Sequence, residues 1–324
     1  MSNGPSIDSP AYGVLVHRPK RNAINIGDYV QAIAVRQALG IKGDSFLLER
    51  EELATYDGPP LRIVGQGWYC HTDGAWPPSS KIDYLPLGIH INPRSYELFL
   101  RPNSRAALDR IAPIGCRDQI TKDFLDKHGV GAYFSACMTL TIQPSSEILR
   151  KPKAIYLIDA SSEAIKLLPT EFKGLPVVQL SHLIPQDPAN PPSHEELLKL
   201  AQARLDEYYR DAAIVVTSRL HALLPSMAMG IPCLWVERRV FDRRLDLARR
   251  YARRSVFPQP DRTGKAVADL LEKFVHPFFA ILGSRGQQAA KLRITPKMDM
   301  KAERARILGL LATAMKKHGW PTAS

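Results

Sequence analysis

Apolar residues in the first half of the chain are grouped in short runs that end at Gly, Asn or a charged residue. The runs cover 12–17, 61–67, 86–91 and 111–118, and the segment 130–142 combines apolar residues with Ser, Thr and Gly. Short apolar runs with such ends are typical of strands that are buried on both faces of a parallel sheet. We therefore expect the first half to be built on a parallel sheet.

Two segments of this half have a helical pattern instead. Apolar residues in 22–40 recur at roughly helical intervals, and Gly40 is placed to end that helix. Asn25 or Asp28 can cap its N-terminus. The segment 119–128 shows a similar pattern before a glycine, so a second helix is expected there.

The second half alternates strand and helix patterns more regularly. Such alternation predicts a doubly wound parallel sheet with helices on both faces. The expected strands are 154–159, 176–181, 212–218 and 231–237, and the expected helices are 193–209, 219–229, 242–253 and 263–274. The tail 297–317 has apolar residues along one side, which predicts an amphipathic helix that packs back across the protein.

The segment 143–153 resembles a linker because it contains Pro and Ser and has no periodic pattern. With 324 residues the chain is long enough for two compact domains, although a single large domain is also compatible with this length. We therefore predict an N-terminal domain over 1–148 and a C-terminal domain over 149–324, which also holds the last helix.

Composition restricts the class of protein further. The longest apolar runs are far shorter than the ~20 residues that span a bilayer, and the first residues lack the basic and apolar regions of a signal peptide. We therefore expect a cytoplasmic protein. None of the four cysteines lies in a C-x-x-C or Cys/His cluster, and the histidines have no metal-binding spacing, so neither a metal nor a cofactor is expected.

The net charge of +12 indicates an anionic partner. The segment 238–254 contains eight arginines and two aspartates and therefore carries half of that charge. It can be a solvated helix face with ion pairs such as Asp246–Arg250, or a surface that meets a lipid-linked diphosphate sugar, an acidic membrane or nucleic acid. A sequence-specific nucleic-acid reader is not expected, because no helix-turn-helix, zinc or RNA-binding motif accompanies the charge.

Ser218, Arg219 and His221 come directly after the apolar run 212–217. In a parallel sheet, ligands bind at the carboxyl ends of the strands, where the N-terminus of the following helix favours an anion. Arg219 can donate to a phosphate or carboxylate, and a His221 with a pKa near neutrality would suit proton transfer. The alternative is a surface ion pair at Arg219 and an ordinary helix position at His221.

The stretch TSRLHALLPSMAMGIPCLWVE (217–237) resembles the C-terminal signature of the polysaccharide pyruvyl transferase family, with its R-L-H triplet and its G-x-P before a strand. NIGDYVQAIAV is similar to the family's N-x-G-D element, GCRDQITKDFLDKHGV to its R-D-x-x-(S/T) element, and SACMTLTI to the segment that follows. The chain departs from the family in having Gly-Gln-Gly-Trp at 65–68, where members have a Gly-Gly pair, and in lacking Asp-Pro within 135–139.

This resemblance implies a fold similar to GT-B glycosyltransferases, in which two Rossmann-like domains face a cleft. It implies the transfer of the enolpyruvyl unit of phosphoenolpyruvate to a sugar, as a pyruvate ketal. By resemblance, Arg117 and Arg219 would hold the donor's carboxylate and phosphate, His221 would protonate C3 of the donor, and Leu220 completes the R-L-H triplet. No cofactor is needed besides this donor substrate.

The remaining candidate residues would bind substrate. Asp28 is either a ligand or base for the acceptor hydroxyl or a helix cap, and Asp118 is either a ligand or the cap of the helix 119–128. The set is completed by Asn25, Ser218, Arg238, Arg239 and Arg243.

The expected acceptor is a saccharide of a cell-surface polysaccharide or its lipid-linked precursor, and contact with the inner face of an acidic membrane is one interpretation of the arginines. Two other functions stay open at this point. The same basic pocket could hold the diphosphate of a nucleotide sugar in a GT-B-like glycosyltransferase. The chain could also be a non-catalytic protein that binds glycans or anions. The oligomeric state is open.

Overall fold

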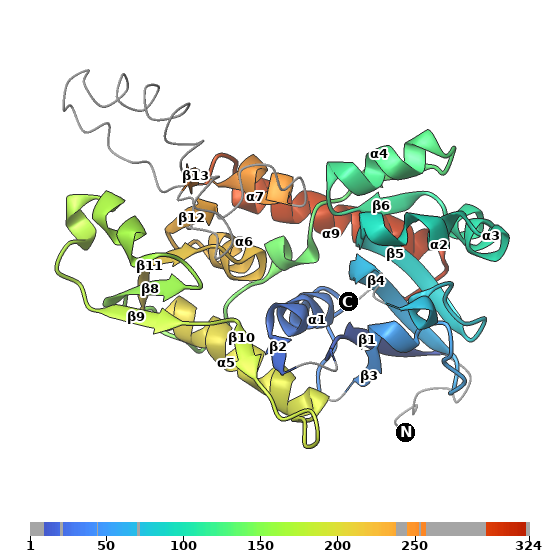
Figure 1. Cartoon of the computed structure of the whole chain (residues 1–324), viewed down its shortest axis with the longest axis horizontal. Helices are drawn as coiled ribbons and strands as arrows, with labels where there is room; N and C mark the ends of the chain where they lie inside the picture. The colour runs from blue at the N-terminus through green and yellow to red at the C-terminus, as the bar shows by residue number, and fades with distance from the viewer. Residues whose placement is uncertain are drawn as a thin grey trace, which may run out of the picture.

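The chain forms two parallel sheets that lie side by side with helix α1 (Gly27–Ala38) between them (Figure 1). The computed structural model describes residues 10–19, 22–43, 45–69, 72–237, 245–252 and 296–321, and the backbone of 254–256. The α/β class and the parallel sheets predicted from the sequence are confirmed within these residues.

The N-terminal sheet has the strand order β3-β1-β4-β5-β6-β7, and all its neighbouring strands are parallel. Its strands are β1 (Ala11–Val16), β3 (Phe46–Glu49), β4 (Leu61–Tyr69), β5 (Ile82–Ile91), β6 (Ile114–Cys116) and β7 (Ala132–Phe134). The predicted strand 111–118 is shorter than expected because its first residue belongs to a helix. The strand β3 was missed, since its apolar run is only three residues long.

The C-terminal sheet has the order β13-β12-β11-β8-β9 and is also parallel. Its strands are β8 (Ala154–Ile158), β9 (Val177–Leu180), β11 (Ala212–Thr217), β12 (Cys233–Glu237) and β13 (Arg254–Val256). A small antiparallel pair, β2 (Ala23–Asn25) and β10 (Leu183–Pro185), joins the two halves. Neither strand of this pair was expected from the sequence.

The other described helices lie close to the predicted positions, apart from two. They are α2 (Tyr96–Leu100), α3 (Pro102–Ile111), α4 (Gln119–Lys127), α5 (His194–Asp211), α6 (Leu220–Ala228), α7 (Asp246–Tyr251) and α9 (Met300–Lys317). Short 3-10 helices are η1 (Arg50–Glu52), η2 (Asp73–Ala75), η3 (Pro93–Ser95), η4 (Met138–Thr141), η5 (Ser162–Leu167) and η6 (Thr170–Phe172). The helices α2 and α3 were missed, and the predicted helix 263–274 lies outside the described residues.

The ends of two helices test the predicted caps. Helix α1 begins after Ile26, and no side chain caps it, so the prediction that Asn25 or Asp28 is its cap is wrong. Asn25 Oδ1 instead accepts the N–H of Gly27 at 3.2 Å, and Asp28 is held by other donors. Asp118 does cap α4, because its Oδ1 accepts the Thr121 N–H at 3.1 Å.

The largest hydrophobic core cluster is shared by the two halves of the chain. It includes Val14 and Leu87 from the N-terminal sheet and Tyr156 and Trp235 from the C-terminal sheet. Helix α1 contacts both α5 and α6, which places it at the centre of this cluster. The predicted division at 148/149 lies between η4 and β8, where the chain has neither helix nor strand. Two domains that each fold alone stay a prediction.

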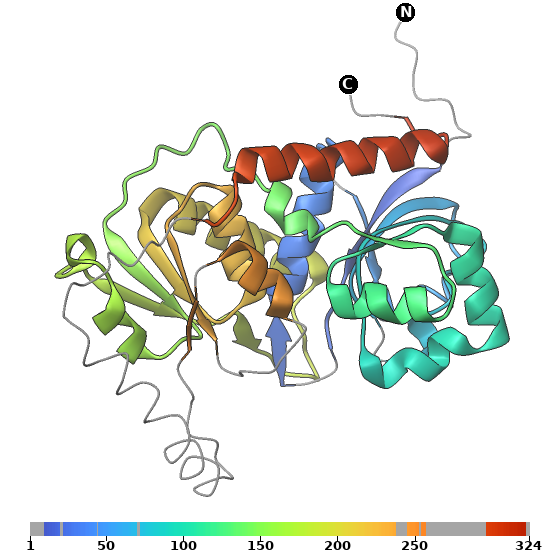
Figure 2. The same ribbon diagram turned by 90° about the horizontal axis from the view of Figure 1, so that it is seen from above.

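Helix α9 runs along the molecule and connects its two halves (Figure 2). Its buried side chains are Glu303, Ile307, Leu311 and Met315, and the helix contacts α6, η4 and β5. Beyond it, His318 Nδ1 lies 3.0 Å from Asp83 Oδ1. This confirms the predicted amphipathic tail. Among the described residues, no helix combines the length and apolarity that a bilayer crossing requires.

Candidate functional site

A cavity of about 860 Å³ lies where the carboxyl ends of β1, β3, β6 and β11 come together. This is the edge at which ligands of parallel α/β sheets bind. Seven of the residues predicted from the sequence line it, namely Asn25, Asp28, Arg117, Ser218, Arg219, Leu220 and His221. The fold therefore brings together residues that are up to 196 positions apart in the chain.

The N-terminus of α6 faces the cavity, and Arg219 is its N-cap residue. The guanidinium Nε of Arg219 donates to Asp159 Oδ2 at 2.7 Å. Asp159 also accepts from the Ser181 hydroxyl and from the N–H of His182. Burial by itself raises the pKa of Asp159. The hydrogen bonds from Ser181 and His182 and the charge of Arg219 lower the pKa by more than burial raises it, so the carboxylate stays ionised. Asp159, which sequence reasoning missed, therefore fixes the position of Arg219.

Arg117 follows β6 and is only 4% exposed, yet it lines the cavity. Its Nε lies 3.6 Å from Asp118 Oδ2 and has no hydrogen-bond partner among the described residues. A buried guanidinium with an unused donor is costly unless a ligand or another acceptor completes it. Arg117 therefore has an ion-pair partner in Asp118 but keeps one donor for a further acceptor.

Asp118 lies behind Arg117 rather than in the lining of the cavity. Its Oδ2 is 2.6 Å from His90 Nδ1, and both side chains are fully buried. Burial raises the pKa of Asp118, but the bond from His90 and the charge of Arg117 outweigh it and lower the pKa. The helix-cap interpretation of Asp118 is confirmed, whereas its role as a substrate ligand stays a prediction.

Asp28 lies in the first turn of α1 and lines the cavity. Its carboxylate accepts from Asn25 Nδ2 at 3.3 Å, Gln31 Nε2 at 3.2 Å and Arg50 at 3.3 Å. Burial by itself raises the pKa of Asp28. The charges of Arg50, His17 and His221 lower the pKa by more than burial raises it, so the net shift is downward. Asp28 is therefore an ionised carboxylate in the middle of the site.

Arg50, the partner of Asp28, was also missed by sequence reasoning. It is 3% exposed and follows β3, the short strand that has no clear sequence signal. A Cβ atom at Gly67 would lie 2.7 Å from Arg50 Nη1, and the φ of Gly67 is +97°. The glycine is therefore required both by the backbone conformation and by the close approach of Arg50. This gives a physical reason for one glycine of the Gly-Gln-Gly-Trp segment.

His221 is packed against the opposite half of the protein. A Cβ atom at Gly27 would lie 3.0 Å from His221 Cβ, and Cys137 Sγ lies 3.9 Å from His221 Nε2. Burial and the charge of Arg117 lower the pKa of His221 to about 3, although Asp28 acts in the opposite direction. The expectation of a pKa near neutrality is therefore wrong for the ligand-free protein, in which His221 is neutral at pH 7.

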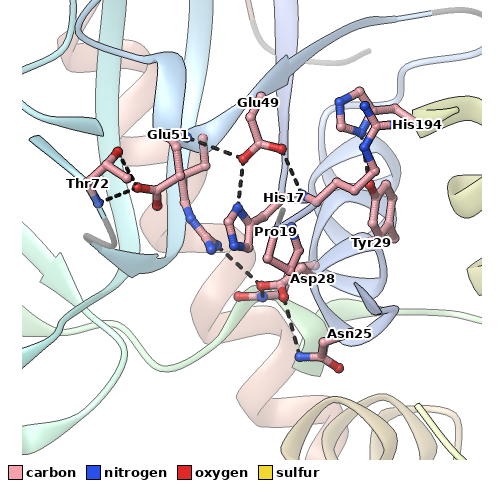
Figure 3. A network of polar contacts seen from close by, with 12 residues as sticks. His17, Pro19, Asn25, Asp28, Tyr29, Glu49, Glu51, Thr72 and His194 are labelled. Atoms are coloured by element: carbon pink, nitrogen blue, oxygen red, sulfur yellow. Dashed lines mark hydrogen bonds and ion pairs between the residues drawn. The ribbon is translucent and has the colours of Figure 1, made fainter. Parts of the chain in front are cut away.

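A second histidine, His17, follows β1 and lines the same cavity together with Glu49 (Figure 3). His17 Nδ1 lies 2.7 Å from Glu49 Oε1. Sequence reasoning checked His17 and the other histidines only for metal-binding spacing, which they do not have, and did not recognise the strand that carries Glu49. Among the described residues, no group of His, Cys, Asp and Glu side chains is arranged to hold a metal ion.

The arginine-rich segment is only partly described. Arg238, Arg239 and Arg243 lie outside the described residues, so their predicted contact with substrate stays a prediction. In α7, Arg249 pairs with Asp246 at 2.6 Å and also with Glu237. The expected Asp246–Arg250 pair is therefore not the one that forms.

Comparisons with known proteins identify one family. The profile of a family described as "Polysaccharide pyruvyl transferase" matches residues 25–239, a range that includes both sides of the cavity. No curated protein matches the chain. One similar solved structure is a functionally uncharacterized protein from Klebsiella pneumoniae subsp. pneumoniae NTUH-K2044, which is 14% identical over 77% of this chain and 93% of that one, with a TM-score of 0.43.

Proposed function

The chain belongs to the polysaccharide pyruvyl transferase family, and on this premise we propose that it transfers the enolpyruvyl unit of phosphoenolpyruvate to a sugar as a pyruvate ketal. The family indicates a transferase that acts on a polysaccharide. The donor and the residues that use it are our proposal.

The observation that carries this proposal is the buried guanidinium of Arg117, whose Nε lacks an acceptor. Phosphoenolpyruvate carries a carboxylate and a phosphate, so it needs two convergent cationic groups. Arg117 and Arg219 line one cavity from the ends of two different strands, and the N-terminus of α6 adds backbone N–H groups. A dianionic or trianionic donor would complete the hydrogen bonds of Arg117.

The proposed reaction uses groups from both halves of the chain. A proton from His221 is added to C3 of the donor, and a sugar hydroxyl attacks C2. The bond between C2 and the phosphate oxygen then breaks, and phosphate leaves with the electron pair. A second hydroxyl then attacks C2 and closes the ketal, and its proton goes to the released phosphate. Arg117 and Arg219 stabilise the charge of the leaving phosphate, and Asp28 accepts a hydrogen bond from the sugar.

The low pKa of His221 in the empty cavity makes donor binding a condition of this chemistry. A neutral imidazole cannot donate a proton to C3. The negative charge of the bound donor opposes the effects of burial and of Arg117, so His221 becomes protonated in the complex. Protonation of the acid is thereby coupled to the presence of its substrate.

The test is incubation with phosphoenolpyruvate and a panel of neutral sugars, with phosphate release as the readout. We expect release that depends on the sugar and is lost in Arg117→Ala and His221→Ala. Full turnover by His221→Ala would contradict the mechanism. Stabilisation and turnover with nucleotide sugars instead would indicate a glycosyltransferase, and glycan binding without any product would indicate a non-catalytic protein.

We further propose that the natural acceptor is linked to a lipid diphosphate. If Arg238, Arg239 and Arg243 meet this carrier or an acidic membrane, their triple alanine variant loses the preference for the lipid-linked acceptor and keeps turnover of the free sugar. Equal preference in the variant and the parent protein would contradict this part of the proposal.

A further inference from the structure

The cavity contains a histidine whose orientation is fixed by a carboxylate. His17 Nδ1 lies 2.7 Å from Glu49 Oε1, and the backbone N–H of Arg18 donates to Glu49 Oε2 at 2.7 Å (Figure 3). Burial raises the pKa of Glu49, but His17, the Arg18 N–H and Arg50 outweigh it and keep the carboxylate ionised. With Nδ1 directed at Glu49, the Nε2 atom is at the opposite edge of the ring. A carboxylate that orients an imidazole in this way prepares Nε2 to accept a proton.

The charges of His17 and His221 both act on one carboxylate, that of Asp28. His17 comes from the end of β1 in the N-terminal sheet, whereas His221 comes from α6 beside the C-terminal sheet. Both imidazoles line the cavity, one from each half of the protein, and so does Asp28.

The charges that line the cavity divide it into two sides. Glu49, Glu51, Glu52 and Asp28 lie in the region of His17 and outnumber Arg18 and Arg50, which line the same region, while Arg117 and Arg219 come from the ends of β6 and β11. A donor with a carboxylate and a phosphate is attracted to the arginines and repelled by the glutamates. Sugar hydroxyls donate hydrogen bonds to carboxylates, so the glutamate side suits the acceptor.

We propose that His17, oriented by Glu49, is the general base that takes the proton from the acceptor hydroxyl. This inference rests on the proposed function. The O–H bond of the sugar breaks and its proton goes to His17 Nε2, while the oxygen forms a bond to C2 of the donor. The C2–C3 π electrons take the proton from His221. The bond from C2 to the phosphate oxygen then breaks, and phosphate leaves with that electron pair.

The proton balance assigns opposite starting states to the two histidines. His17 begins neutral and ends protonated, whereas His221 begins protonated and ends neutral. Asp28, with its three donors and its lowered pKa, is a weak base and serves to orient the hydroxyl. Among the described residues, the charged or titratable groups near His17 include Glu49, Arg18, Arg50 and Asp28, and His194 of α5, whose pKa is lowered by burial and raised by the charge of Glu49.

The test compares His17→Gln with the parent protein, and His318→Gln is the matched control. His318 also has Nδ1 paired with a carboxylate, at 3.0 Å, but it lies outside the cavity. In His17→Gln we expect kcat for phosphate release to fall by about 10²–10⁴-fold. The dissociation constant for phosphoenolpyruvate should stay within about twofold of the parent value, because the donor binds to the arginine side. His318→Gln should keep both values.

Glu49→Gln tests the positioning role of the carboxylate. Glutamine keeps the size of the side chain but carries no charge to hold His17, so kcat should fall while the dissociation constant for phosphoenolpyruvate stays within about twofold of the parent value. A role in folding alone would lower the amount of folded protein and leave kcat per folded molecule unchanged. Circular dichroism shows whether His17→Gln folds. If it does not fold, His17→Asn replaces it as the test variant.

Three results would overturn the inference. One is an unchanged kcat and pH profile in folded His17→Gln, with an active parent protein. Another is a loss of donor affinity in His17→Gln as large as in Arg117→Lys, which would make His17 a donor ligand. The third is a parent protein that is inert toward phosphoenolpyruvate with every acceptor, in which case the proposed function fails and the base assignment fails with it.

Discussion

Binding of the donor should be accompanied by uptake of a proton at His221. In the ligand-free protein, burial and Arg117 lower the pKa of His221 from 6.5 to about 3. Each pKa unit corresponds to about 1.4 kcal/mol, so the protein favours the neutral imidazole by about 5 kcal/mol relative to water. To be half protonated at pH 7, His221 must gain about 5–6 kcal/mol from the bound donor.

The donor can supply this free energy. Two opposite unit charges about 4 Å apart interact by about 4 kcal/mol at an effective dielectric constant of about 20. Two negative charges of phosphoenolpyruvate near the imidazole are therefore sufficient, whereas a neutral sugar is not. We expect the pKa of His221 to lie near or above neutrality only in the donor complex.

Isothermal titration calorimetry in buffers of different ionisation enthalpy measures this proton uptake directly. At about pH 7 the parent protein should take up close to one proton more than His221→Gln on binding the donor. The subtraction removes the contribution of the donor's own phosphate, whose second pKa is about 6. The donor affinity of the parent protein should also strengthen as the pH falls toward 6, relative to the variant.

Equal proton uptake by the parent protein and His221→Gln would refute this reasoning. His221 would then stay neutral in the donor complex, and the proton for C3 would have to come from another group. His318→Gln, which alters a histidine outside the cavity, should behave as the parent protein.

Three further predictions concern the groups around the site. Gly27→Ala places a Cβ atom 3.0 Å from His221 Cβ, so kcat should fall about tenfold through misplacement of the imidazole, and unchanged phosphate release would contradict this. Asp118→Asn removes the ionised partner of the buried His90 but keeps the cap, and we expect urea denaturation to show a loss of about 1–3 kcal/mol. Burial lowers the pKa of His182 to about 4, so the unfolded chain binds more protons between about pH 6.5 and 4, and stability falls as the pH falls through that range. The free energy of unfolding is measured by urea denaturation at about pH 7.5 and 5. In His182→Gln its decrease with falling pH should be smaller by up to about 1.4 kcal/mol per pH unit. The same pH dependence in the variant and the parent protein would contradict this prediction.

The sequence predicted the part of the site that follows from one local rule, namely that ligands bind where a strand of a parallel sheet ends and a helix begins. Ser218, Arg219 and His221 follow a run of aliphatic residues and precede a helix, so their place at the carboxyl end of a strand could be inferred from neighbouring residues alone. Arg117 was instead assigned by resemblance to the family, because the strand predicted over 111–118 included it, whereas β6 ends at Cys116. The local pattern was sufficient only at the strand end before Ser218.

The rest of the site depends on contacts between distant segments. Glu49 is the last residue of β3 and Arg50 follows it, and this strand, which pairs with β1, has an apolar run of only three residues. The pKa of His221 could not be foreseen either, because it depends on burial and on Arg117, which is 104 positions away. The sequence shows which side chain is present at a position. It does not show which charges the fold places next to that side chain, and these charges change its pKa.

The shared core gives a physical reason for building this chemistry from two halves. Helix α1 carries Asp28 and packs directly against α6, which carries His221. At Gly27 the absence of a side chain allows the two helices to approach closely. Any separation of the halves would therefore increase the distance between Asp28 and His221 and admit water around Arg117. The packing that buries the core is thus the same packing that lowers the pKa of His221.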